Sequence, residues 1–157
     1  MSKEFSLKNF FQEIEKLLKD DHFYDALKIA KNYSEKEPRL LRNPFFLNLI
    51  GFINLNLKDW DTAILNFEKA IKLDENHKPA YFNLAIAFYD LGDMKSSYEN
   101  LIKVSNIDKD NKRVKENITK ILNHIDINKK NDPLSRANHE LQKIKIDSFL
   151  IDKTEVS

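Results

Sequence analysis

Residues 44–111 contain the same pattern twice, 34 positions apart, and this self-similarity limits the fold more than any other feature of the chain. The matching positions are Leu47 and Tyr81, Ile50 and Leu84, Gly51 and Ala85, Ala63 and Ser97, Phe67 and Leu101, Ala70 and Val104, and Leu73 and Ile107. A fixed period of this length is the signature of a repeat array. A single repeat cannot bury its own apolar side, so stacked copies supply the core for one another.

Each repeat is predicted to be a pair of α-helices joined by a short turn. In the second half of the first matched unit, Ile64, Phe67 and Ile71 recur at helical spacing. Small residues occupy the positions where paired helices would cross, and they permit an approach of about 8 to 10 Å: Gly51, Ala63, Ala70, Ala85 and Ser97. The chain has two glycines and four prolines in 157 residues, as a helical protein requires. We therefore predict an all-α fold with seven helices before residue 128.

The remainder of the repeat domain extends this array at both ends. Residues 7–40 are interpreted as a degenerate first repeat, because residues 23–26 match residues 60–63 at an offset of 37. The three additional residues are assigned to positions 41–43. Residues 44–77 and 78–111 are the second and third repeats. Residues 112–127 are apolar on one side and are predicted to be a terminal capping helix, which completes a domain spanning residues 1–127.

Residues 128–157 are predicted to be a linker followed by an amphipathic helix or tail. Asp132 and Pro133 form a helix-start signal, and an apolar stripe follows as far as Ile151. An isolated helix of this length is marginal in water, so its stripe needs a surface to cover. We hypothesise that the segment folds back over part of the repeat array.

The period, the helix-turn-helix layout and the alternation of small and large residues resemble the tetratricopeptide repeat. The resemblance implies an α-solenoid of three helical hairpins plus a capping helix, in which the first helix of each repeat lines a concave groove. It also implies that the groove binds a protein or peptide partner. In size and repeat number, the chain is similar to the cytoplasmic chaperones of bacterial secretion translocators.

Carried over from the groove positions of that family, the resemblance implies nine candidate peptide-binding residues: Phe11, Phe45, Asn48, Phe52, Leu55, Phe82, Asn83, Ile86 and Tyr89. Most are large and apolar, which suits an amphipathic helix or an extended peptide with apolar anchors. Family members that bind heat-shock chaperone tails have lysine and asparagine where this chain has Phe11 and Glu15, so that ligand is not expected. A register shifted by one residue would instead place some of the nine in the core. Four other aromatic residues are expected to be core residues: Phe23, Trp60, Phe67 and Phe88.

Charge and composition exclude several classes of function. The chain has 26 basic and 25 acidic residues, and this balance predicts neither nucleic-acid binding nor attraction to an anionic membrane. There is no cysteine, and no apolar run of about 18 residues is available for membrane insertion. The first residues lack the basic and apolar regions of a signal peptide. We expect a cytoplasmic protein.

No constellation of residues predicts catalysis, a metal or a cofactor. The histidines are far apart in the sequence and are interpreted as solvated or capping residues: His22, His77, His124 and His139. Acidic pairs such as Asp20–Asp21 lie at predicted turns, where aspartate serves as a turn and cap residue. We therefore expect a non-catalytic adaptor or small chaperone. The alternative is a structural assembly protein, a homodimer that self-associates through its C-terminal segment.

Overall fold

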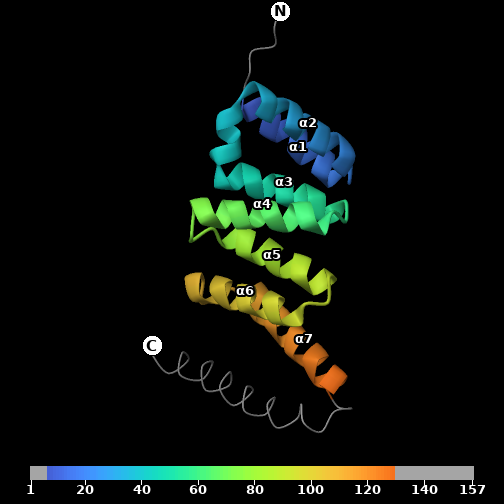
Figure 1. The fold of residues 1–157 in the computed structure, drawn as a ribbon, viewed down its shortest axis with the longest axis vertical. Coiled ribbons are helices and arrows are strands. Elements are labelled where there is room, and N and C mark those ends of the chain that lie inside the picture. The colour runs from blue at the N-terminus through green and yellow to red at the C-terminus, as the bar shows by residue number, and fades with distance from the viewer. Residues whose placement is uncertain (1–6, 130–157) are drawn as a thin grey trace, which may run out of the picture. The chain divides into compact units, whose positions relative to one another are not determined.

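The computed structural model describes residues 7–129, which form helices joined by short turns, without a strand in that range (Figure 1). The elements are α1 (Leu7–Lys19), α2 (Phe23–Lys36), a short 3-10 helix η1 (Pro38–Arg42), α3 (Pro44–Asn56), α4 (Trp60–Leu73), α5 (Lys78–Asp90), α6 (Met94–Ile107) and α7 (Lys112–Lys129). The predicted all-α class and the seven helices are confirmed, with α7 ending at Lys129 rather than at residue 127.

Backbone contacts divide the chain into two units, Met1–Glu116 and Asn117–Ser157, and the boundary falls inside α7. The first unit contains the three helical hairpins and the first turn of α7. In the second unit, the described residues are those of α7, where Ile118 and Ile121 are buried. The linker and C-terminal segment predicted for residues 128–157 lie, apart from the end of α7, outside the described residues. The proposed fold-back therefore stays a prediction.

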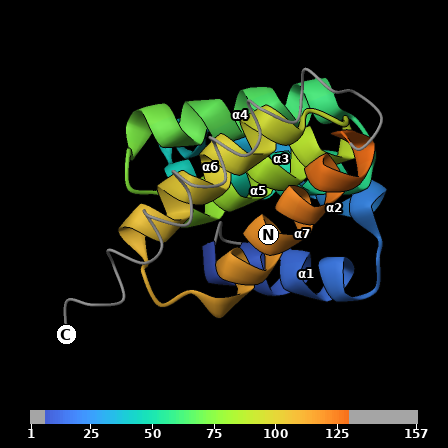
Figure 2. The ribbon, with the colours of Figure 1, turned by 90° about the horizontal axis from the view of Figure 1, so that it is seen from below.

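Within the first unit, each repeat is a hairpin whose two helices pack side by side, and each second helix also packs on the first helix of the next repeat. Viewed from below, α4 and α6 lie on one side, with α3 and α5 beneath them (Figure 2). The first helices α3 and α5 also contact each other directly. This arrangement brings the first helices of successive repeats next to one another on one face of the unit.

The helices of the second and third hairpins approach closely because a small residue faces a large one. A Cβ atom built on Gly51 of α3 would lie 2.5 Å from Cε1 of Phe67 in α4, so only glycine fits beside this buried ring. The equivalent residues of the third repeat are Ala85 and Leu101, both buried. In the third repeat, leucine replaces the larger phenylalanine, and alanine, which has one more methyl group, replaces glycine. Gly51 is therefore confirmed as a crossing position, and the other four predicted positions are buried: Ala63, Ala70, Ala85 and Ser97.

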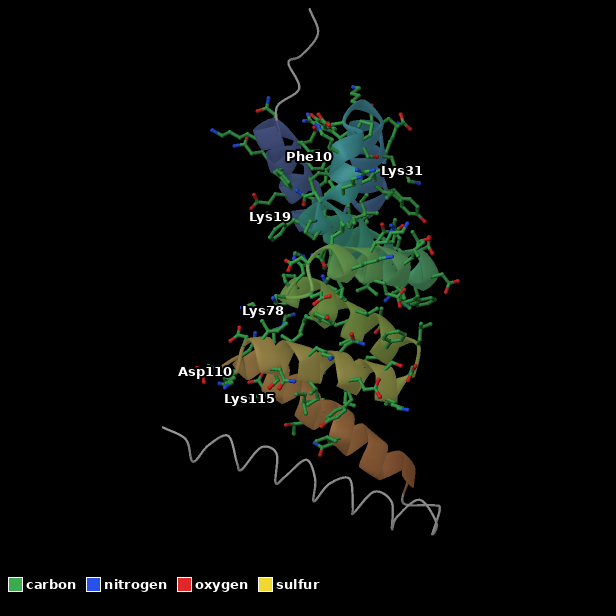
Figure 3. The ribbon with its side chains drawn as sticks, turned by 60° about the vertical axis from the view of Figure 1, so that its left-hand side comes forward. Phe10, Lys19, Lys31, Lys78, Asp110 and Lys115 are labelled. Carbon is green, nitrogen blue, oxygen red and sulfur yellow. The ribbon has the colours of Figure 1, made fainter. Side chains whose placement is uncertain are left out.

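The first hairpin reverses this size relation. At the same two positions it has Ile14 on α1 and Ala30 on α2, and both are buried in one hydrophobic cluster. Phe10 also belongs to this cluster and lies between α1 and α2 (Figure 3). Each hairpin therefore combines one large and one small side chain at this level, whichever helix carries the large one.

The turn inside each hairpin places one residue in the left-handed region of backbone conformation. These residues are Asp21 with φ 58°, Lys58 with φ 64° and Gly92 with φ 80°. Aspartates then begin two of the second helices: Asp59 Oδ1 accepts from the Thr62 amide and Asp93 Oδ1 from the Ser96 amide. The predicted turn and cap roles of the acidic residues are confirmed there.

The three residues inserted between the first and second repeats are accommodated by η1. Leu40 anchors this 3-10 turn in the core, with 6% of its surface exposed. Asn43 then caps α3, because its side-chain oxygen accepts hydrogen bonds from the amides of Phe45 and Phe46. The insertion therefore ends in a defined helix start and leaves the second repeat in register.

The first unit contains two hydrophobic clusters, and α3 contributes to both. Phe46, Ile50 and Ile53 of α3 belong to the cluster of the first hairpin. Leu47 and Leu55 belong to the cluster that continues through α4 and α5. The four aromatic residues expected in the core are confirmed there, with Phe67 fully buried and the others packed against the clusters: Phe23, Trp60 and Phe88.

Candidate functional site

Helix α3 is apolar on nearly every side, although the repeats bury only part of it. It contains no charged residue. Phe46 and Leu47 are buried, whereas the adjacent Phe45 exposes 63% of its surface. Asn48 lies three residues after Phe45, and Phe52 lies four residues after Asn48, so all three are on one side of the helix. Asn48 and Phe52 are half-buried. This side of α3 therefore presents aromatic surface outside the core.

Helix α5 carries a similar side. Phe82, Ile86 and Tyr89 recur at helical spacing, with Asn83 beside them. Tyr89 is 39% exposed, and the other three are half-buried. On α1, Phe11 is 47% exposed, and its ring meets the buried ring of Phe10 edge-on. We call the following residues the first-helix face: Phe11, Phe45, Asn48, Phe52, Phe82, Asn83, Ile86 and Tyr89.

Leu55 does not belong to this face, and its assignment as a groove residue is wrong. Its side chain is 6% exposed and lies in the cluster that contains Leu84 and Ala87 of α5. Helices α3 and α5 contact each other, and Leu55 is part of the core between the second and third repeats. Tyr89 occupies the same repeat position one unit later and remains exposed.

Two contacts across neighbouring helices organise the face. Asn83 Nδ2 on α5 donates a hydrogen bond to Asn48 Oδ1 on α3 over 3.0 Å. The guanidinium carbon of Arg113 lies 4.9 Å from the centre of the Phe82 ring, which is a cation–π contact. Arg113 is in the first turn of α7 and lies in the same unit as Phe82. These contacts restrict the side chains of the face.

His77 is buried beside the first-helix face, which the sequence did not predict. It is the N-cap residue of α5, but its side chain makes no capping hydrogen bond and is 2% exposed, so the solvated interpretation is wrong. Its Nδ1 lies 3.4 Å from Asp74 Oδ2, and Nε2 is buried without a partner. The ring packs edge-on against Phe45, with 4.7 Å between ring centres. A contact between residues so far apart in the sequence leaves no local signal.

Ion pairs lie at the two ends of α5, one within the third repeat and one between the second and third repeats. Lys78 Nζ lies 3.2 Å from Asp108 Oδ2, and Lys58 Nζ lies 3.5 Å from Asp90 Oδ2. Lys78 is at the start of α5, as Figure 3 shows. Its hydrogen bond holds the pKa of the Asp108 carboxyl group below its usual value. Asp90, the acidic residue of α5, is thus paired with a cation beside the face.

Among the described residues, no group of three histidine, cysteine or acidic side chains is placed to hold a metal ion. A search of the same residues for a helix long and apolar enough to cross a membrane finds none.

The sequence matches a family profile for the tetratricopeptide repeat in two successive segments, residues 46–77 and 79–111. These segments coincide with the α3–α4 and α5–α6 hairpins. These two hairpins are tetratricopeptide repeats. A search of curated protein sequences finds no match.

Solved structures of tetratricopeptide repeat domains share this fold. The first such domain of Spaghetti (RPAP3), bound to an HSP90 peptide, has a TM-score of 0.66 at 16% identity, covering 74% of this chain and 90% of that one. The Yersinia enterocolitica type III secretion chaperone SycD, in complex with a peptide of the translocator YopD, has a TM-score of 0.66 at 15% identity, covering 82% and 100%. The Sgt2 domain from Aspergillus fumigatus has a TM-score of 0.69 at 17% identity, covering 80% and 83%. These similarities show that the chain shares the fold of these structures.

Proposed function

We propose that this protein is a non-catalytic peptide-binding module, a cytoplasmic adaptor or small chaperone that holds an apolar peptide segment on its first-helix face. The observation that carries the proposal is the exposed aromatic surface along α1, α3 and α5. Phe11, Phe45 and Tyr89 expose 47%, 63% and 39% of their surfaces. Aromatic side chains that the fold itself does not bury are the usual anchors of a protein interface.

The arrangement of these residues supports binding rather than additional core packing. Phe52 and Phe82 lie outside both hydrophobic clusters, although both are large and apolar. Phe45 is held by the buried ring of His77, and Phe82 by Arg113. Side chains that are restrained before a partner arrives lose less conformational freedom on binding. The face is therefore suited to binding a peptide without first reorganising.

Proteins with the same fold also support the proposal. Two of the structural neighbours were solved with bound peptides, one from HSP90 and one from the translocator YopD. In the first repeat of this chain, Phe11 and Glu15 occupy the positions where chaperone-binding members have lysine and asparagine. That difference favours an apolar segment over a terminal carboxylate as the ligand of this protein.

Substitution of the face tests the proposal. Peptides are first selected on the full-length chain from a displayed library of random dodecamers, and the tightest is labelled for fluorescence anisotropy. Phe52→Asp and Phe82→Asp should each weaken its binding by about 2 kcal/mol, or roughly thirtyfold in Kd, as expected for a buried aromatic anchor. Thermal unfolding followed by circular dichroism should show that both variants remain folded.

Leu65→Asp is the matched control, because Leu65 is 49% exposed on the second helix α4. It should leave the affinity unchanged. Failure to select any peptide, or an equal loss of affinity in all three variants, would exclude the first-helix face as the binding site. Unfolding of both phenylalanine variants would show that these rings are structural.

A further inference from the structure

The residue directly before α3, α5 and α7 occupies one repeated position, and it is asparagine, histidine and asparagine in turn. These residues are Asn43, His77 and Asn111, each 34 positions after the one before. Asn43 Oδ1 accepts hydrogen bonds from two amides of α3, and Asn111 Oδ1 accepts one from the Val114 amide. The side chain of His77 makes no such bond. Because asparagine is among the best capping residues, histidine gives up a local stabilisation here.

His77 is buried against the first-helix face instead of capping its helix. Its side chain is 2% exposed, and its Nε2 atom is buried without a hydrogen-bond partner. The ring lies edge-on against Phe45, with 4.7 Å between ring centres. A buried polar atom without a partner destabilises a fold, and the missing cap adds to that cost. A role for the ring in the face accounts for both.

We propose that His77 is a positioning residue of the first-helix face: its neutral ring supports Phe45, and protonation of the ring releases Phe45 and weakens peptide binding. This inference rests on the proposed function of the same face. Histidine is the side chain that ordinarily takes up a proton between pH 5 and 8. The affinity for a peptide therefore falls as the pH falls through this range.

The buried position of the ring suits a neutral histidine better than a charged one. A protonated ring carries an N–H group on both nitrogens, and the one on Nε2 would have no acceptor. The ring lies at the start of α5, where the helix dipole disfavours a positive charge. Lys78, the next residue, is also a cation, and its Nζ is paired with Asp108 at 3.2 Å. Helix α3, which supplies Phe45, has no charged or titratable residue that would offset the charge.

Asp74 offers the protonated ring a partner nearer to solvent. Its Oδ2 lies 3.4 Å from Nδ1 of His77, and its side chain is 40% exposed. Two other titratable residues are close in the chain: Glu75, which is exposed and also attracts a cation outward, and the half-buried Tyr81, which is neutral in this pH range. A charged ring turned outward keeps its ion pair with Asp74 and places Nε2 in water. Phe45 then loses the contact that restrains it.

A bound peptide couples the protonation of His77 to the affinity. Phe45 is 63% exposed, so an apolar segment that covers it adds a second layer over the neutral ring. A ligand that binds one state of a protein has its apparent affinity reduced by the fraction of molecules in that state. Kd should therefore rise by about tenfold between pH 7.5 and pH 5.5, the range in which histidine takes up its proton.

The test uses the full-length chain and the tightest peptide from the dodecamer library described above, labelled with a dye that is insensitive to pH. His77→Asn restores the asparagine of the two equivalent positions, so it should remain folded and cap α5, as thermal unfolding will show. Its affinity at pH 7.5 should be about fivefold lower, because Phe45 loses its support. Between pH 7.5 and pH 5.5, the Kd of this variant should change by less than about twofold.

His22→Asn is the matched control for the substitution. His22 precedes α2 without capping it, and its Nδ1 lies 3.9 Å from Asp25 Oδ2, but its side chain is 60% exposed. This variant should keep the tenfold pH effect. Phe45→Ala tests whether His77 acts through the Phe45 ring, and it should bind more weakly at pH 7.5 and lose the pH effect.

Calorimetry of the unmodified chain provides a second measurement that needs no variant of His77. Peptide binding at pH 6 is measured in two buffers with different ionisation enthalpies, and the difference gives the number of protons exchanged. Binding should release a part of one proton per peptide, because the bound state holds the neutral ring. His22→Asn should release the same amount.

The outcomes separate this inference from the function on which it depends. Recovery of no peptide would overturn both. An affinity that does not fall at pH 5.5, a fall that persists in His77→Asn, or binding without proton release would overturn the inference and leave peptide binding intact. A pH effect that is lost in His77→Asn and Phe45→Ala but kept in His22→Asn would establish it. If His77→Asn does not fold, proton release by the unmodified chain and its loss in Phe45→Ala decide.

Discussion

At the residue scale, one turn position per repeat requires a left-handed backbone, and the three repeats fill it with Asp21, Lys58 and Gly92. A side chain in this conformation costs about 1 kcal/mol, whereas glycine adopts it freely. A Cβ atom added to Gly92 would meet no atom within 4 Å. Any cost of substitution there is therefore conformational and not steric.

We predict that Gly92→Ala lowers the free energy of unfolding by about 1 kcal/mol, whereas Lys58→Gly raises it by about 0.5. The gain is smaller because Lys58 also pairs with Asp90 at the surface, an interaction of low value. Urea unfolding of the three proteins measures both changes. Changes of the same sign in the two variants would show that backbone conformation does not control these turns.

A second residue-scale prediction concerns Asp93, which caps α6. Its carboxylate accepts a hydrogen bond from Ser96 Oγ over 2.6 Å and another from the Ser96 amide over 3.0 Å, and these bonds lower its pKa. The stability that it contributes is complete above the unfolded pKa, near pH 4, and is lost as the pH falls through the lower pKa of the folded state. Asp93→Ala should therefore cost about 1 kcal/mol at pH 7 and much less at pH 2. Equal losses at both pH values, measured by urea unfolding, would rule out the carboxylate as the origin.

Local residue roles were predictable where the cause is local. Aspartates at the predicted turns were expected to be turn and cap residues, and Asp59 caps α4. His77 was misplaced because its burial depends on Phe45, which is more than thirty positions earlier in the chain. Nothing in the residues adjacent to His77 distinguishes a buried ring from a solvated one.

At the scale of elements, the hairpins depend on matched side-chain sizes at the helix crossing. Gly51→Ala should destabilise the protein by about 1 to 3 kcal/mol, because the new methyl group would overlap the buried Phe67 ring. The compensating change Phe67→Leu reproduces the Ala85–Leu101 pair of the third repeat. The double variant should therefore be more stable than the sum of the two single effects predicts.

A double-mutant cycle by urea unfolding measures this coupling, which should be about 1 kcal/mol or more in the favourable direction. Ala63→Leu is a control, because it overpacks another buried position of α4 that Phe67→Leu is not designed to relieve. Additive effects of Gly51→Ala and Phe67→Leu would show that the two residues do not compete for one space.

The periodicity of the sequence predicted the positions of the helices, but it did not predict the conformation of the insertion or the burial of Leu55. The insertion at residues 41–43 was located from the change in offset, whereas its 3-10 conformation depends on Leu40 entering the core. Leu55 was assigned to the peptide-binding set because its repeat position faces the groove in the related family. It is buried in a cluster with residues of the next repeat, whereas Tyr89 at the same repeat position is exposed, so a single repeat position does not determine exposure.

At the scale of the whole molecule, α3 connects two otherwise separate clusters of the first unit. Ile53 is fully buried in the first cluster, and Leu84 is buried in the second. In a repeat array, a local defect acts mainly on its nearest neighbours. Ile53→Ala should therefore accelerate hydrogen exchange in α1 and α2 more than in α5, and Leu84→Ala should do the reverse.

Hydrogen exchange followed by mass spectrometry resolves these segments, and each substitution should cost about 2 to 5 kcal/mol. A uniform acceleration over all helices of the first unit in both variants would indicate one cooperative core instead of two coupled clusters.

The dual role of α3 also has a consequence for the order in which the protein folds on the ribosome. The α1–α2 hairpin is synthesised before α3, so Phe10, Ile14 and Leu40 are complete in sequence while Phe46, Ile50 and Ile53 are still missing. We expect a nascent chain stalled before α3 has emerged to be cleaved readily by protease, and one stalled after α3 to be protected. Protection that begins with α2 alone would contradict this order. Until α3 emerges, the apolar side chains of the first hairpin lack the α3 residues that cover them, so this hairpin is the part that a molecular chaperone would have to protect.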